Sequence, residues 1–220
     1  MALTKFNYNS FDVTPVASKA LAFNSDADGL TTAAGGAMVL IKTLTASSSA
    51  TLSFVDGADD VVLDNTYTTY LFKFINLHPA TDTANFTFNM SADSGSNYNV
   101  TKTSSFVYSL HHETSGATSV AYNAAADLAQ GTGFQRLLDY LSIDNDAQVS
   151  GTLQLFNPSS TTFVKHWISR QQSYRSDLYC ENTLVAGYGN TTSAVDAIRF
   201  QMSSGNIDAG DIKLYGIKDS

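Results

Sequence analysis

Apolar and polar residues alternate with a period of two along most of the chain beyond Gly36. In segment 85–91, phenylalanine or methionine occupies every second position, with hydroxyl or amide residues between them. This period places side chains on the two faces of a β-strand, whereas a helix repeats about every 3.6 residues. Turn-forming residues separate the alternating segments. The pattern predicts about ten strands: 38–41, 50–55, 67–77, 85–91, 105–110, 151–156, 162–169, 178–188, 197–202 and 211–217.

The number and spacing of these segments predict an all-β protein, a two-sheet antiparallel sandwich of jelly-roll type. One segment departs from the pattern, because Phe134, Leu137, Leu138 and Leu141 recur at helical spacing. We therefore expect at most one short helix, over 134–141.

The alternation also assigns an inner and an outer face to the clearest strands, because a slip of one residue would exchange the two faces. Six apolar side chains should point between the sheets: Phe86, Phe88, Ile198, Phe200, Ile212 and Leu214. Their polar neighbours should point outward: Thr87, Asn89, Arg199, Gln201 and Lys213.

Two domains are predicted. Residues 1–36 lack a clear period and are interpreted as an extended N-terminal arm that contacts a neighbouring subunit, or else as an irregular extension. Residues 37–220 form the sandwich. Within the arm, Asn24, Asp26 and Asp28 match the first half of a calcium-binding loop. The position that normally holds a bidentate glutamate is Gly35, so we expect a polar turn and no bound metal.

Composition narrows the possible functions. The chain has 20 acidic and 12 basic residues, with a net charge of −8, which argues against binding to nucleic acid or another polyanion. Cys180 is the only cysteine, so no intramolecular disulfide forms, and a free thiol fits synthesis in a reducing cytoplasm. The first residues show no basic and apolar signal peptide, and no segment approaches the length of a membrane-spanning helix.

Catalytic constellations are not evident in the sequence, and no enzyme activity or cofactor is expected. Only two of the acidic residues are glutamates, and the aspartates cluster in turns, which leaves no clear pair of opposed carboxylates for glycoside hydrolysis. His111 and His112 are adjacent at the end of a predicted strand, so their side chains point to opposite faces. They therefore cannot coordinate one metal ion from the same side.

Aromatic and amide side chains concentrate near the last third of the chain. Exposed aromatics beside arginine suit the faces and hydroxyls of sugars, or a protein partner, while the alternative interpretation is packing within the core. The candidate surface comprises Trp167, Arg170, Tyr174, Arg175, Tyr179 and Tyr188.

An ordered set of strings resembles a family of β-rich virion proteins from marine tailed bacteriophages, including cyanophage-like ones. The strings are 61–70 (VVLDNTYTTY), 74–82 (FINLHPATD), 150–153 (SGTL), 156–166 (FNPSSTTFVKH), 186–188 (AGY), 190–194 (NTTSA), 198–207 (IRFQMSSGNI) and 212–217 (IKLYGI). Members of this family have no assigned enzyme activity, so the resemblance implies a particle component and supplies no catalytic residues.

This resemblance implies a non-enzymatic structural protein of the virion, made in the host cytoplasm. We expect a surface module of a tail fibre, tail tip or other appendage that adheres to the host. A capsid decoration or head fibre protein is the first alternative, and a secreted glycan-active enzyme is the second. The expected partners are further copies of the chain, as a trimer, other virion proteins, and a host-surface glycan or protein, with no nucleic acid and no membrane insertion.

Overall fold

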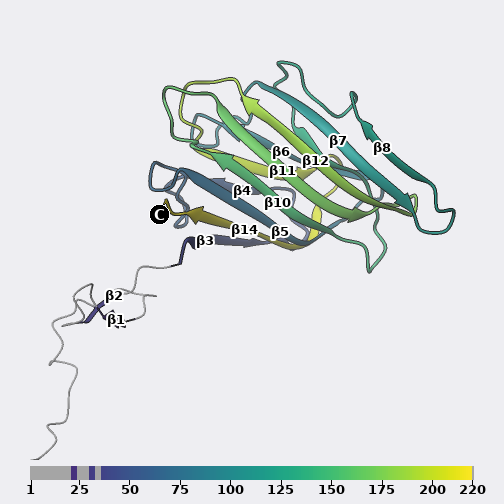
Figure 1. Cartoon of the computed structure of the whole chain (residues 1–220), viewed down its shortest axis with the longest axis horizontal. Helices are drawn as coiled ribbons and strands as arrows, with labels where there is room; N and C mark the ends of the chain where they lie inside the picture. Colours follow the sequence, from purple (N-terminus) through teal and green to yellow (C-terminus); the bar gives the residue numbers. More distant parts are fainter. Residues whose placement is uncertain (1–20, 24–29, 33–35, 220) are drawn as a thin grey trace, which may run out of the picture.

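The computed structural model describes residues 21–23, 30–32 and 36–219, and these contain strands and turns but no helix. β1 (Leu21–Phe23) and β2 (Leu30–Thr32) pair with each other in the segment predicted to be an arm. Twelve further strands form two antiparallel sheets (Figure 1). Their bounds are β3 (Met38–Thr45), β4 (Leu52–Val55), β5 (Thr69–Pro79), β6 (Ala84–Ser91), β7 (Lys102–His112), β8 (Thr118–Tyr122), β9 (Gln135–Leu141), β10 (Val149–Phe156), β11 (Lys165–Tyr174), β12 (Tyr179–Gly189), β13 (Ala197–Met202) and β14 (Ile207–Ile217).

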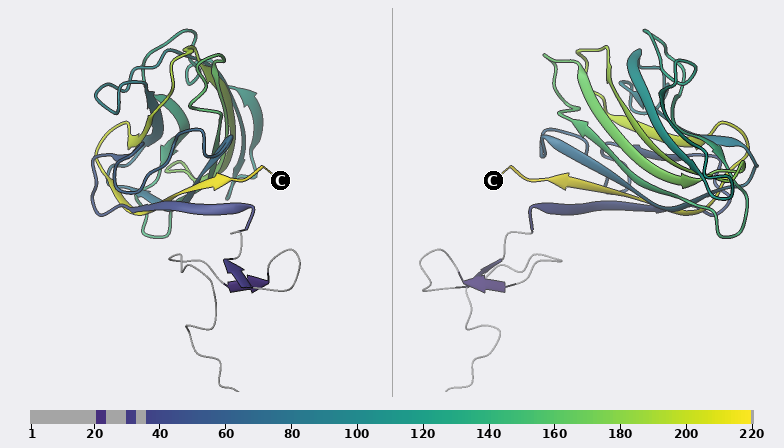
Figure 2. Two further views of the ribbon diagram at one scale, coloured as in Figure 1. Left: turned by 90° about the vertical axis from the view of Figure 1, so that its left-hand side faces the viewer. Right: turned by 45° about the vertical axis from the view of Figure 1, so that its right-hand side comes forward.

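The two sheets differ in size. The large sheet has eight strands in the order β3-β14-β5-β10-β11-β12-β7-β8, and the small sheet has four in the order β4-β13-β6-β9. The large sheet curves around the small one, so that one of its faces is covered and the other is not (Figure 2). The all-β sandwich is therefore confirmed, but the strand order does not confirm a jelly-roll connection.

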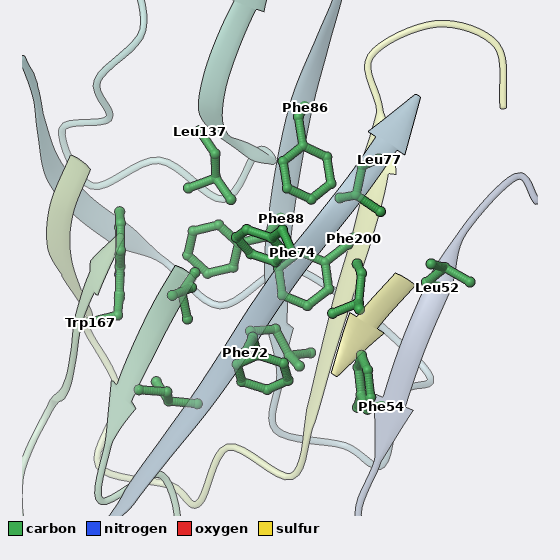
Figure 3. Packing of buried hydrophobic residues seen from close by; sticks show 14 of the residues in the cluster. Leu52, Phe54, Phe72, Phe74, Leu77, Phe86, Phe88, Leu137, Trp167 and Phe200 are labelled. Atoms are coloured by element: carbon green, nitrogen blue, oxygen red, sulfur yellow. The ribbon is translucent and has the colours of Figure 1, made fainter. Parts of the chain in front are cut away.

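The centre of the sandwich is filled by phenylalanine rings from both sheets (Figure 3). Phe200 on β13 lies among five of them, with ring centroids at 5.2 Å from Phe74, 5.4 Å from Phe72 and 5.8 Å from Phe86. Phe88 and Phe54 complete the set at 6.3 Å and 6.4 Å. Most of these pairs are tilted or edge-to-face, the arrangement that the charge distribution of aromatic rings favours.

The predicted inner face is confirmed, since all six of its apolar side chains are fully buried. The predicted outer face is only partly solvent-exposed. Thr87 and Asn89 point away from the large sheet, but both are buried. The Asn89 amide donates hydrogen bonds to the carbonyls of Tyr98 and Thr132, because the chain around both residues folds over the small sheet. The alternation of apolar and polar residues shows which side of a strand a residue faces. It does not show whether another part of the chain covers that side.

The helix considered for 134–141 is absent, and this segment is strand β9. Its pairing with β6 contains two register shifts, and Tyr140 has a left-handed backbone with φ of 52°. These bulges interrupt the strict alternation of faces, so that Leu137, Leu138 and Leu141 are all buried from one strand. The resulting spacing imitates that of an amphipathic helix.

Candidate functional site

The large sheet presents an outer face that no other strand of the described chain covers. Along β11, residues alternate strictly between buried and more exposed positions, and the exposed positions belong to this face. The same alternation holds on the neighbouring strand β12 over most of its length. We take this outer face as the candidate functional site, because it is the broadest regular surface in the described structure.

A row of side chains crosses this face with cations at one end and apolar groups at the other. The registers of the paired strands place these residues side by side: Lys213, Lys73, Thr152, Arg170, Leu184, Val107 and Tyr122. Neighbouring strands in a sheet are about 4.8 Å apart, so the three cations span roughly 15 Å. None of the three takes part in an ion pair within the described residues.

Acidic residues are scarce in the large sheet. Among its eight strands, only β12 and β14 contain any. Glu181 on β12 points inward and is buried, while Asp208 and Asp211 on β14 lie near His78 and the hydroxyl of Thr45. The acidic charge of the protein is thus carried largely by its loops, and the outer face is locally basic despite the net charge of −8.

Beside Arg170, the outer face is hollowed over β11, β12, β7 and β8. The hollow has a volume of about 490 Å³ and opens to solvent. Its lining combines hydroxyl, amide, imidazole and apolar groups, among them Ser109, His111, Thr118, Val120, Gln172 and Asn182. The hydroxyl and amide groups among them donate and accept hydrogen bonds without carrying charge, which suits a hydroxyl-rich ligand.

The six residues predicted to form a partner surface do not lie on one face. Trp167 is fully buried between the sheets, with its ring 4.8 Å from that of Phe88. Arg175 is also buried and pairs with Asp177 at 2.8 Å and Glu181 at 3.4 Å. The prediction is wrong for these two residues, because odd-numbered positions of β11 point inward and Arg175, directly after the strand, is also buried.

Tyr179 is half-buried beside Arg175, whose guanidinium lies 5.7 Å from the centroid of its ring. Arg170, Tyr174 and Tyr188 do occupy the outer face, since they alternate with buried neighbours on β11 and β12. Tyr188 lies opposite His166 in the strand register, and the two rings are 6.1 Å apart. Half of the predicted surface set therefore belongs to the candidate site.

Beneath the small sheet, the inward-facing residues of β11 and β12 form a polar cluster. The Gln171 amide donates to the Ser169 hydroxyl, and the Thr183 hydroxyl donates to the Leu137 carbonyl at 2.8 Å. Glu181 and Ser173 lie opposite each other in the register. One carboxylate oxygen of Glu181 and the Ser173 hydroxyl have no hydrogen-bond partner among the described residues.

Burial shifts the ionisation of several inward-facing groups. It raises the pKa of Glu181 to about 7, an effect that the nearby Arg175 guanidinium opposes. Burial likewise raises the pKa of Asp139, which lies 3.5 Å from Arg136. At the other end of the sheet, burial lowers the pKa of Lys102 to about 7, although its ammonium donates hydrogen bonds to Asn89 and the Val100 carbonyl. These groups are enclosed, so they bear on stability and not on contact with a ligand.

The metal prediction concerns residues outside the described part of the chain, since Asn24, Asp26 and Asp28 fall within 24–29. Among the described residues, no three His, Cys, Asp or Glu side chains are grouped as metal ligands would be.

The described chain also contains no helix of the length and apolarity needed to span a membrane. Cys180 is free and exposed at the hollow.

Comparison with known proteins returned no match: neither a protein family, nor a curated protein, nor a solved structure resembles the chain closely enough. The site is therefore interpreted from its own geometry.

Lys73 was not singled out from the sequence, and Lys213 was predicted to face outward but not to belong to a binding surface. Each is the charged member of an alternating segment, and this position indicates that each faces outward. Their juxtaposition with Arg170 depends on the order of β14, β5, β10 and β11 in the sheet. The sequence alone contains no local signal for that order.

Proposed function

We propose that the protein is a non-enzymatic component of a bacteriophage particle that attaches, through the outer face of its large sheet, to an anionic polysaccharide of the host surface. The observation that carries this proposal is the row of Lys213, Lys73 and Arg170 on an uncovered sheet face of an otherwise acidic protein. Unpaired cations on a regular surface attract carboxylate or phosphate groups and speed the encounter with them.

The hollow beside Arg170 supports a sugar as the rest of the ligand. Gln172 and Asn182 offer amide groups, and Ser109 offers a hydroxyl, all on one open face. These groups match the donors and acceptors of sugar hydroxyls, while the cations match the acidic substituents of the polymer. The negative loops would repel the same polymer, which confines binding to this face.

The assignment to a phage particle rests on the ordered strings described above, from 61–70 to 212–217. An appendage that recognises the host is preferred to a capsid decoration protein, because a ligand-accessible cationic face is of direct use at the tip of a particle. Immunogold labelling of intact particles of the encoding phage should mark a tail appendage. Labelling distributed over the head would favour the decoration alternative.

Binding to polygalacturonate, with uncharged dextran as the reference polymer, tests the adhesive role. We expect retention on immobilised polygalacturonate that falls with added NaCl, and no retention on dextran. The double change Lys73→Ala and Arg170→Ala should weaken binding about tenfold at low salt and reduce its salt dependence. Lys42→Gln is the matched control, because Lys42 lies opposite inward-facing Leu214. Equal binding by the double variant and the control would refute the proposal.

A further inference from the structure

The four sheet edges of the sandwich are not equally protected. Exposed edge strands tend to pair with other chains, and proteins usually prevent this with bulges, short strands, charges or proline. β4 has only four residues, and the pairing of β9 contains two register shifts. β3 has a register shift beside Lys42, whose ammonium donates to the Asp59 carbonyl at 2.7 Å. Three edges therefore carry a recognised form of protection.

β8 is the fourth edge; it is a five-residue strand and has no bulge, no charge and no proline. Its sequence, Thr-Ser-Val-Ala-Tyr, contains no charge and no proline, and its pairing with β7 shows no register shift. Val120, at its centre, is 78% exposed, and Tyr122 is 52% exposed. β-branched and aromatic residues of this kind favour an extended strand. Within the described chain, β8 pairs with β7 alone.

The backbone of β8 shows which of its groups face outward. Asn123 N–H donates to the Phe106 carbonyl, and His112 N–H donates to the Ala117 carbonyl. Hydrogen-bonded pairs alternate along an antiparallel ladder, so Ser119 and Ala121 direct their backbone groups toward β7. Thr118, Val120 and Tyr122 therefore direct theirs away from the sheet, where no other strand of the described chain lies.

We infer that a second copy of this chain pairs with β8, strand to strand and antiparallel, about a two-fold axis that passes beside Val120. In this register Val120 meets Val120 of the partner subunit, and Thr118 meets Tyr122 of the partner subunit. All three outward-facing residues then exchange backbone hydrogen bonds with the partner subunit. The strand is short and carries no charge, so two copies of it can lie side by side without electrostatic repulsion. A protein of net charge −8 would repel its copies over most of its surface, so an uncharged strand is the favoured point of contact.

The β8 edge adjoins an apolar part of the outer face. Tyr122 lies beside Val107, and Val107 lies beside Leu184 on the outer face of the same sheet. Val107 is 37% exposed and Leu184 is 50% exposed. Antiparallel pairing about a two-fold axis keeps the outer faces of both copies on the same side of the joined sheet. The inference does not depend on the proposed adhesive role, but it would place two candidate sites on one continuous surface.

Sedimentation velocity of the full chain over a range of concentrations tests this inference. We expect a dimer that Val120→Lys weakens at least tenfold, because the axis places two like charges directly opposite each other. Leu184→Lys is the matched control, because it adds the same charge to an exposed apolar position away from the edge. Circular dichroism verifies that both variants keep the fold.

Variants with opposite charges at position 120 distinguish pairing between two β8 strands from contact of β8 with a different surface. Val120→Lys and Val120→Glu should each be monomeric alone, and an equimolar mixture should form a heterodimer. A mixture that stays monomeric would show that β8 meets a different surface of the neighbouring copy, which overturns the inference. A monomeric wild-type chain, or a trimer indifferent to Val120→Lys, overturns it as well.

Discussion

The two halves of the sandwich interior are held by different forces. Phe200 and the five phenylalanine rings around it fill the space between the sheets, and no charged group intervenes. Beneath β9, the same inter-sheet space contains Gln171, Thr183, Glu181 and Arg175, linked by hydrogen bonds and an ion pair. The aromatic half contributes the hydrophobic stabilisation, whereas the polar half has a stability that depends on partners and protonation.

This contrast predicts that the aromatic half responds most strongly to truncation. Phe200→Ala should lower the free energy of unfolding by about 3–5 kcal/mol, because it removes a ring packed against five others and leaves a cavity. Such a loss is a large part of the stability of an ordinary domain. Urea unfolding measures it, with Phe163→Ala, at a position 68% exposed, as the control. A change below about 1 kcal/mol would remove the distinction between the two halves.

The polar half should instead make the free energy of unfolding depend on pH. The pKa of Glu181 is raised from 4.5 to about 7 in the folded protein, so folding favours its protonated form. This contribution to stability is complete below pH 4.5 and is lost as pH rises through about 7. The wild-type stability should therefore lose on the order of 3 kcal/mol across this window relative to Glu181→Gln.

Changes at other positions serve as controls for this measurement and refine its interpretation. Glu113→Gln alters the only other glutamate, which is exposed, and serves as the control for removing a carboxyl group away from the polar cluster. Arg175 and Asp139 act on Glu181 directly, and Asp177 pairs with Arg175, so changes at these positions should alter the apparent midpoint. Parallel pH profiles for the wild type and Glu181→Gln would show that this carboxyl is not held in its protonated form.

The smallest effect is expected on the outer side of the small sheet. The Arg199 guanidinium lies 3.9 Å from the centroid of the Tyr98 ring, and its Nε donates to the Ser53 hydroxyl at 3.0 Å. Arg199→Ala should therefore cost about 1 kcal/mol, mainly through the lost ring contact. Arg199→Lys should cost part of that amount, since lysine keeps the charge but not the planar group. A loss equal to that of Phe200→Ala would invert the assignment of faces on β13.

Much of the fold could be predicted from the sequence, because alternation is a local property. Ile198, Phe200 and Ile212 were assigned to the interior from their spacing alone, and all are buried. Strand β8 was missed, since it is short and nearly all of its residues are exposed, which leaves no buried face for the alternation to mark. Trp167 was assigned to a surface by its chemistry, although its position in β11 determined its burial.

The candidate site was harder to predict for a related reason. Net charge is a sum over the whole chain, and it obscured a local arrangement of Lys73, Arg170 and Lys213. That arrangement depends on which strands are neighbours, and its members lie between 43 and 140 residues apart along the chain. Pairing order is set by the global packing of the two sheets, which no single segment specifies.

The position of β14 has a consequence for how the protein folds as it is synthesised. β14 lies between β3 and β5, two strands that precede it by well over a hundred residues. A nascent chain that has completed β13 still lacks the strand that joins β3 to the remainder of the large sheet. Contacts between segments so far apart in the sequence form slowly. Until they form, the unpaired strand edges of the partly folded chain can associate with other chains. Folding of the large sheet should therefore be completed only after β14 has left the ribosome, which makes this strand the last requirement for a soluble product.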